Sequence, residues 1–342
     1  MRHVNIPIFI PHLGCPNQCI FCNQRYISGT VEFDESKVIK SIEDVLTTVN
    51  DSDTCEIAFF GGSFTGIDRD LMVRLLNIAQ RYVNLGKVTG IRMSTRPDYI
   101  SREILDILKK YTITCVELGI QSMNDDVLAY LKRGHKVADT EMATKLLRAN
   151  GFNFVGQMMI GLPSATKEDE IFCAERICAL GAIGSRIYPT LVFRMTELEG
   201  LLKNGEYTPL TLDDAIVRSA AALKVFVRNG VDCIRIGLCD SDNLHSSDTF
   251  VAGPNSPSIG EMVKSELYYQ LICEILERDS LINNDIIIEC CKGHTSQVVG
   301  HKRNNITKLQ KKYGLTKVKT IENPELNIYE IKIRKKEENS CV

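Results

Sequence analysis

The chain has 342 residues, of which 44% are hydrophobic and 25% are charged, and its formal net charge is −2. This is ordinary globular composition with enough apolar material for a sizeable core. No apolar run reaches the length of a membrane span and the first residues do not resemble a signal peptide, so we expect a cytoplasmic protein outside the membrane. The thirteen cysteines are odd in number and scattered, which is typical of reduced thiols rather than of a disulfide framework.

Segments of strand length alternate with segments of helical periodicity along most of the chain. We predict strands at residues 4–10, 56–60, 88–93, 115–120, 154–160, 186–192 and 233–236. We predict helices at residues 35–49, 69–83, 102–111, 139–150, 167–180 and 213–229, several of them ending at a glycine: Gly86, Gly151, Gly181 and Gly230. Such alternation predicts parallel strands joined by right-handed crossovers, hence a barrel, a partial barrel or a doubly wound sheet.

Three cysteines follow the first predicted strand, in the run CPNQCIFC that contains Cys15, Cys19 and Cys22. Their spacing lets one loop direct three thiolates at a single point. A zinc ion or a 4Fe–4S cluster normally takes four protein ligands, and no fourth Cys or His lies close by in the loop. A cluster with three ligands has one open iron, which favours a catalytic site. A zinc site completed by a distant Cys or His is the alternative.

A second motif, Gly61-Gly62-Ser63, follows the second predicted strand. Paired glycines let a ligand approach the backbone closely. Together with the cysteine loop, this motif resembles the radical S-adenosylmethionine (SAM) superfamily. The resemblance implies that the three cysteines hold a 4Fe–4S cluster, that SAM chelates its open iron, and that reductive cleavage of SAM gives a 5′-deoxyadenosyl radical. It also implies that Gly61, Gly62 and Ser63 meet the methionine end of SAM and that Phe21 packs near the adenine.

Further segments indicate which families within this superfamily the sequence resembles. The segment ELGIQS at 117–122 resembles a strand of the oxygen-independent coproporphyrinogen III oxidases and of the Elongator catalytic subunit. By that resemblance Gln121 and Gln157 contact the SAM ribose and Arg133 pairs with the SAM carboxylate. The likeness to the Elongator subunit runs over roughly residues 50 to 215 and includes STRPDY (94–99), KRGH (132–135), GFNFVGQMM (151–159) and YPTLVFR (188–194). No acetyltransferase-like pattern follows residue 240.

The C-terminal residues differ in net charge from the rest of the chain. From Asp285 onward the sequence holds twelve Lys or Arg against seven Asp or Glu, whereas the remainder is acidic. The pattern strand 286–290, helix 296–299, GHKR loop, helix 304–313 and strands 317–321 and 328–333 resembles a KH-type RNA-binding core. Lys302 and Arg303 in that loop are therefore candidates for contacts with RNA phosphates. A small appendage with a solvated charged face is the alternative.

We therefore expect an α/β fold: a partial barrel of radical SAM type at 1–250, a connecting helical segment at 251–284, a basic KH-like module at 285–336 and a tail at 337–342. The leading interpretation is a radical SAM enzyme that modifies RNA, with tRNA as the expected substrate in keeping with the Elongator resemblance. Its expected electron donor is a flavodoxin-like or ferredoxin-like protein. The same chemistry on a small molecule such as a tetrapyrrole is one alternative. A zinc-stabilised RNA-binding protein without catalysis is the other.

Overall fold

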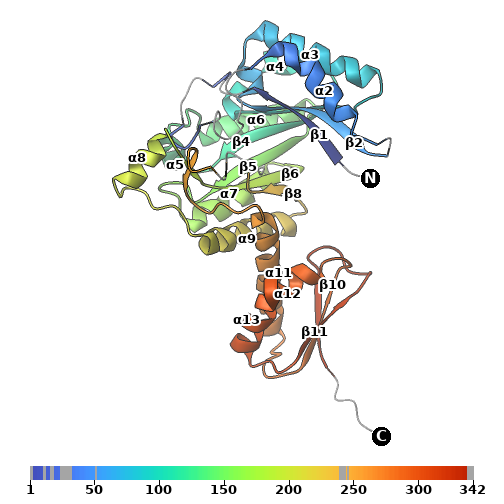
Figure 1. The fold of residues 1–342 in the computed structure, drawn as a ribbon, viewed down its shortest axis with the longest axis vertical. Helices are drawn as coiled ribbons and strands as arrows, with labels where there is room; N and C mark the ends of the chain where they lie inside the picture. Colours follow the sequence, from blue (N-terminus) through green and yellow to red (C-terminus); the bar gives the residue numbers. More distant parts are fainter. Residues whose placement is uncertain are drawn as a thin grey trace.

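The computed structural model of the protein describes residues 3–10, 13–15, 19–23, 33–50, 52–238, 244 and 246–336. The chain forms a large α/β part and a smaller C-terminal part, and the long helix α11 (Ile259–Arg278) runs from one into the other (Figure 1). The expected fold class is confirmed, because the large part is a partial barrel and the small part is a separate α/β appendage.

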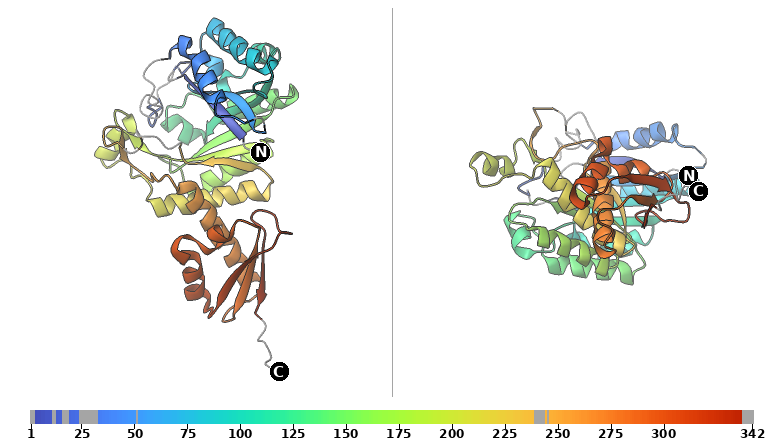
Figure 2. Two further views of the ribbon diagram at one scale, coloured as in Figure 1. Left: turned by 45° about the vertical axis from the view of Figure 1, so that its right-hand side comes forward. Right: turned by 90° about the horizontal axis from the view of Figure 1, so that it is seen from below.

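One curled sheet of seven parallel strands forms the large part. Helices surround its outer side, as the view from below shows (Figure 2). Neighbours in the sheet follow the order of the chain, which is the arrangement that right-handed strand–helix units produce. The strands are β1 (His3–Ile10), β2 (Thr54–Gly61), β3 (Gly90–Thr95), β4 (Ile113–Gln121), β5 (Phe154–Ile160), β6 (Gly184–Pro189) and β8 (Asp232–Ile236).

The covering helices begin and end where the sequence supplies caps. Thr166 and Asp169 form a capping box at the start of one helix, and Asp68 caps another through the N–H of Leu71. The four glycines expected at helix ends all have positive φ, as left-handed caps require. The helices are α2 (Val38–Leu46), α3 (Arg69–Asn84), α4 (Arg102–Leu108), α6 (Val137–Ala149), α7 (Lys167–Ala179) and α9 (Leu212–Arg228).

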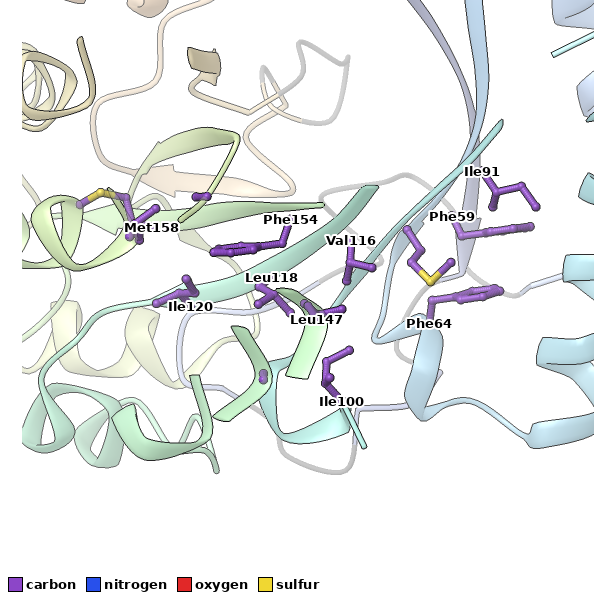
Figure 3. Close-up of a cluster of buried hydrophobic side chains, with 14 of the residues drawn as sticks. Phe59, Phe64, Ile91, Ile100, Val116, Leu118, Ile120, Leu147, Phe154 and Met158 are labelled. Carbon is purple, nitrogen blue, oxygen red and sulfur yellow. The ribbon is translucent and has the colours of Figure 1, made fainter. Parts of the chain in front are cut away.

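The main core lies between the sheet and these helices. Side chains that alternate along the strands point into it, and Phe59 on β2 stacks on Phe64 with ring centroids 4.3 Å apart (Figure 3). Val116, Leu118 and Phe154 continue this layer across β4 and β5. Because successive strand residues point to opposite faces, the residues between them face the inside of the partial barrel. The charged strand residues Glu56, Arg92, Glu117 and Arg186 alternate with the core residues and lie on that inner face.

The strand predicted at 186–192 is wrong as a single element. β6 ends at Pro189, and β7 (Val192–Phe193) pairs antiparallel with β9 (Phe250–Ala252) instead of continuing the sheet. Thr190 makes the last contact with β5, since its backbone N–H and its side-chain hydroxyl both donate to the carbonyl of Ile160 at 2.8 Å, and the residues after it pair with β9 instead. Two short helices were not predicted, α5 (Asp125–Tyr130) and α8 (Glu197–Lys203).

The C-terminal part follows the expected order of strand, helix, loop, helix and two strands. Its elements are β10 (Ile286–Cys290), α12 (Thr295–Val299), α13 (Asn304–Tyr313), β11 (Val318–Glu322) and β12 (Ile331–Lys335). β10 is central, parallel to β11 and antiparallel to β12. The last strand begins three residues later than predicted, and Ile328, which precedes it, is exposed.

Helix α11 contributes to both hydrophobic cores: Val263 and Leu267 pack in the large one, Ile272 and Leu276 in the small one. A connecting helical segment at 251–284 is part of the domain division expected from the sequence. The division at residues 250, 284 and 336 stays a prediction, and the tail 337–342 lies outside the described residues. Within the described part of the chain, no helix is both long enough and apolar enough to cross a bilayer.

Candidate functional site

The cysteine loop leaves the carboxyl end of β1, at the edge of the sheet where the chemistry of parallel barrels is found. Cys19 is 5% exposed, whereas Cys15 and Cys22 are partly exposed. The N–H of Cys22 donates to the carbonyl of Cys19 at 3.0 Å, so these two residues share one turn. Among the described residues, no three His, Cys, Asp or Glu side chains already stand in the positions of metal ligands. The assignment of the three thiols as ligands therefore stays a prediction.

The middle of the loop is anchored through Ile20. Its N–H donates to the carbonyl of Leu131 at 3.2 Å, and its carbonyl accepts from Leu198 at the start of α8 at 2.8 Å. Phe21 packs beside it in a small apolar cluster that includes Met159. This cluster holds the aromatic ring next to the cysteine turn, and contact of Phe21 with the SAM adenine stays a prediction.

The Gly61-Gly62-Ser63 turn receives the start of the cysteine loop. The N–H of Gly62 donates to Ile10 at 2.8 Å, and the N–H of Ser63 donates to Leu13 at 3.2 Å. The Ser63 hydroxyl lies 3.6 Å from the sulfur of Cys15. A Cβ on Gly62 would collide with the carbonyl oxygen of Leu13. The glycine is thus required by backbone-to-backbone packing of the loop, and direct contact of this turn with SAM stays a prediction.

Arg133 joins the cysteine loop to the sheet. Its Nη1 lies 3.6 Å from the sulfur of Cys19, and its Nη2 donates to the carbonyl of Gly119 on β4 at 2.8 Å. The Nε of this buried side chain has no hydrogen-bond partner among the described residues. Lys132 and Gly134 on either side have positive φ, and this tight turn directs the guanidinium inward.

Gln121 and Gln157 form a reciprocal amide pair next to Arg133. Each Nε2 donates to the other residue's Oε1, at 2.8 and 2.9 Å. Gln121 has a φ of 69°, a strained value for a residue with a side chain. A Cβ on Gly119 would lie 2.8 Å from Arg133 Nη2 and 2.9 Å from Gln121 Nε2. Gly119 therefore makes room for the three predicted SAM-binding side chains, which the fold brings together.

Lys302 and Arg303 do not join this group, because they lie between α12 and α13 in the C-terminal part (Figure 1). Both side chains are exposed and neither forms an ion pair within the described chain. Their φ values are 49° and 63°, and Gly300 before them has a φ of 78°. Two successive non-glycine residues in this region cost about 1–2 kcal/mol each. Strained, unpaired cations in one loop are consistent with a binding role.

Sequence reasoning missed a buried charge network on the inner face of the sheet. Arg92 donates to Glu56 and to Glu117, at 2.9 Å in both cases, and Arg186 lies 2.7 Å from the second oxygen of Glu117. All four side chains are at most 11% exposed. The available signal was a charged residue inside each of four apolar strand segments, at β2, β3, β4 and β6.

His135 lies two residues after Arg133. It is 3% exposed, and burial followed by the charge of Arg133 lowers its pKa to about 3. The ring is therefore neutral at physiological pH. Outside the loop, burial raises the pKa of the Cys115 thiol to about 12 and that of the Cys233 thiol to about 11.

Two family profiles match the sequence. The radical SAM superfamily matches residues 9–174, and a radical SAM C-terminal domain matches residues 183–269. Both matches fall within the large part and α11, so the C-terminal part lies outside them.

Curated relatives match mainly the large part. An uncharacterised protein of Methanocaldococcus jannaschii is 30% identical over 61% of this chain and 67% of its own length. A tRNA uridine(34) acetyltransferase of Dehalococcoides mccartyi is 27% identical over 65% of this chain, and Elongator complex protein 3 of Schizosaccharomyces pombe is 36% identical over 42%. The chain spans only 57% and 27% of the length of these last two proteins.

Among solved structures, the Elp3 protein of the archaeon Methanocaldococcus infernus has a TM-score of 0.61 and 23% identity. It covers 82% of this chain, which spans 63% of it. At this identity the likeness shows a shared fold.

Proposed function

Because the chain belongs to the radical SAM superfamily, we propose that Cys15, Cys19 and Cys22 hold the 4Fe–4S cluster that this enzyme uses together with SAM. When bound, the cluster and SAM supply one-electron cleavage of SAM and, from it, a radical that abstracts hydrogen. Membership of this family favours the enzyme over the non-catalytic zinc protein.

The residues of the loop fit such a cluster. Three thiols at this spacing are soft ligands suited to iron–sulfur chemistry. Cys19 is buried against Arg133, whose guanidinium lies 3.6 Å from its sulfur. The Nε of Arg133 is a buried donor without a hydrogen-bond partner among the described residues. A bound anionic group would satisfy it.

The observation that carries the proposal is the group formed by Cys19, Arg133 and the Gln121–Gln157 pair. Arg133 supplies a cation for the SAM carboxylate, since a guanidinium binds carboxylates well. The amide pair supplies donors and acceptors for the ribose hydroxyls. Phe21 supplies an apolar ring for the adenine, and Gly61, Gly62 and Ser63 hold the loop that presents the cluster.

The electron comes from outside the protein, because enzymes of this superfamily need a reductant. We propose a flavodoxin-like or ferredoxin-like donor, and a reducing, cytoplasmic setting for an oxygen-sensitive cluster.

We propose tRNA as the substrate. Support comes from the relatives that carry the name tRNA uridine(34) acetyltransferase. Independent support comes from the basic C-terminal part, in which Lys302 and Arg303 are exposed and free of ion pairs among the described residues. A positively charged module on an acidic body is typical of a protein that binds a polyanion.

The test is anaerobic reconstitution followed by addition of SAM and dithionite, with 5′-deoxyadenosine measured with and without bulk tRNA. We expect a brown protein with about four iron and four sulfide per chain. We expect 5′-deoxyadenosine to depend on the three cysteines and to rise with tRNA. The matched control is a variant with Cys55→Ser, Cys115→Ser and Cys173→Ser, three buried thiols outside the loop.

Cleavage that is indifferent to tRNA would favour a small-molecule substrate such as a tetrapyrrole. A colourless protein that binds zinc and cleaves no SAM would contradict the whole proposal.

A further inference from the structure

The turn after β3 contains an arginine whose position the proposed function does not use. Arg96 is 1% exposed and is the largest of the fully buried side chains. Its Nε and Nη2 donate to the two carboxylate oxygens of Asp98, at 2.9 and 2.7 Å. Its guanidinium lies 5.6 Å from the ring centre of Tyr99. Two edges of the group are thus held in place.

The third nitrogen of Arg96 is different. Nη1 is buried and has no hydrogen-bond partner among the described residues. Leaving a buried donor unpaired costs about 1–3 kcal/mol, and more when the group is charged. The ion pair with Asp98 uses only Nε and Nη2 of Arg96, so that pair does not explain why Nη1 is buried without a partner. The free N–H groups therefore point to a missing acceptor.

The surroundings of Arg96 point to the cysteine loop as the place of that acceptor. Gly66 packs against the Tyr99 ring on one side and against the carbonyl of Gly14 on the other, so the turn after β3 meets the start of the cysteine loop. Burial lowers the pKa of Arg96, but Asp98 and then the charges of Cys19 and Cys15 raise it above its usual value. The guanidinium thus lies within electrostatic reach of two of the three thiols.

We propose that Arg96 is a positioning residue for the cluster. Its fixed guanidinium offers a hydrogen-bond donor and a positive charge to the cysteine sulfur that ligates the cluster, and thereby raises the reduction potential of the cluster. This inference rests on the proposed role of Cys15, Cys19 and Cys22. Arg96 acts on the same loop as Arg133 but is separate from the predicted SAM contacts. Asp98 holds it in orientation and reduces its net charge.

The sign of the effect follows from charge. A cluster gains one negative charge when it is reduced, so a nearby cation stabilises the reduced form more than the oxidised form. Hydrogen bonds to the sulfur atoms and the net charge around the site are known determinants of cluster potential. Loss of Arg96 should make the cluster harder to reduce. Loss of the Asp98 charge should make it easier to reduce.

The experiment measures the midpoint potential of the reconstituted cluster without SAM, by a redox titration followed by electron paramagnetic resonance. Four variants are compared with the wild type: Arg96→Gln, Arg96→Lys, Asp98→Asn and, as a control, Arg218→Gln. Arg218 is also an arginine paired with a buried carboxylate, Glu170, but it lies on α9 away from the loop. Iron and sulfide content and thermal unfolding are recorded for every variant.

We expect Arg96→Gln to shift the midpoint potential in the negative direction, Asp98→Asn to shift it in the positive direction, and Arg96→Lys to restore most of the wild-type value. Arg218→Gln should leave it unchanged. A purely structural role would not produce shifts of opposite sign from the two partners of one ion pair.

A full cluster with an unchanged potential in both Arg96→Gln and Asp98→Asn would overturn the inference. If Arg96→Gln does not fold, the direction of the shift in Asp98→Asn decides. Absence of a cluster from the wild-type protein would instead overturn the proposed function, so the two failures are distinguishable.

Discussion

Nη1 of Arg133 lies 3.6 Å from the sulfur of Cys19, although 114 residues separate the two in the sequence. The same guanidinium binds the carbonyl of Gly119, so one side chain joins the cysteine loop, the turn after α5 and strand β4. This contact places Cys19, a proposed cluster ligand, next to Arg133, a proposed SAM ligand.

Arg133→Lys should weaken SAM binding by roughly 10- to 100-fold, since a charge-assisted hydrogen bond contributes about 1.5–3 kcal/mol. A lysine keeps the charge but lacks the planar fork that meets a carboxylate. Calorimetric titration of the reconstituted protein with SAM measures the change. The exposed Arg81→Lys is the control, and equal affinities in the two variants would contradict the assigned role.

Gly62→Ala should displace the cysteine loop, because a methyl group there collides with the carbonyl of Leu13. We expect a loss of stability of about 1–3 kcal/mol and iron content well below that of the wild type. Gly200→Ala is the control: Gly200 lies in α8 with open space around it, so alanine should stabilise by up to about 1 kcal/mol. Normal iron loading in Gly62→Ala would show that the loop tolerates the shift.

Glu117→Gln should destabilise the protein by about 3–5 kcal/mol, because it leaves Arg92 and Arg186 without their shared buried carboxylate. Urea unfolding of the protein without cofactors measures this loss. The exposed Glu103→Gln should change stability by less than about 0.5 kcal/mol. A similar small effect at Glu117 would mean that water reaches the network.

His135 makes stability depend on pH. Its pKa in the folded protein, about 3, lies below the ordinary value of about 6.5. In the unfolded chain His135 therefore binds a proton that it does not bind in the folded chain. Stability falls as the pH falls from about 6.5 toward 3. Above that window the contribution of His135 is fully present.

His135→Gln should flatten the dependence of the unfolding free energy on pH between 7 and 5, measured by urea unfolding. The exposed His301→Gln serves for comparison and should keep the wild-type slope. Equal slopes in all three proteins would show that His135 takes up its proton normally when folded.

Lys302→Glu combined with Arg303→Glu should weaken tRNA binding and reduce its salt dependence by about two in the logarithmic slope, one unit for each lost phosphate contact. Filter binding at several salt concentrations gives both quantities. Lys109→Glu with Lys110→Glu, an exposed pair on the large part, is the matched control. SAM cleavage without tRNA should be unchanged in both, and retention of full tRNA affinity would count against the loop.

Local pattern made much of the fold predictable. Alternation of strand and helix periodicity predicted the parallel sheet, since hydrophobic spacing follows directly from the geometry of each element. It failed at residues 186–192, where an apolar run continues but β6 ends at Pro189 and the next strand, β7, pairs with β9. Such a contact joins two distant strands and leaves no trace in the periodicity of either.

The sequence by itself determined the chemistry that the protein can use: three cysteines in one loop, a glycine pair after the next strand and an ordered series of polar residues. Only the tertiary structure decided how these groups meet. Sheet register and loop packing bring Arg133 to Cys19, set Gln121 against Gln157, and bury Arg96 beside the cysteine loop with one nitrogen free. These contacts depend on which strands are neighbours and on how far each loop folds back, and local sequence spacing does not fix either.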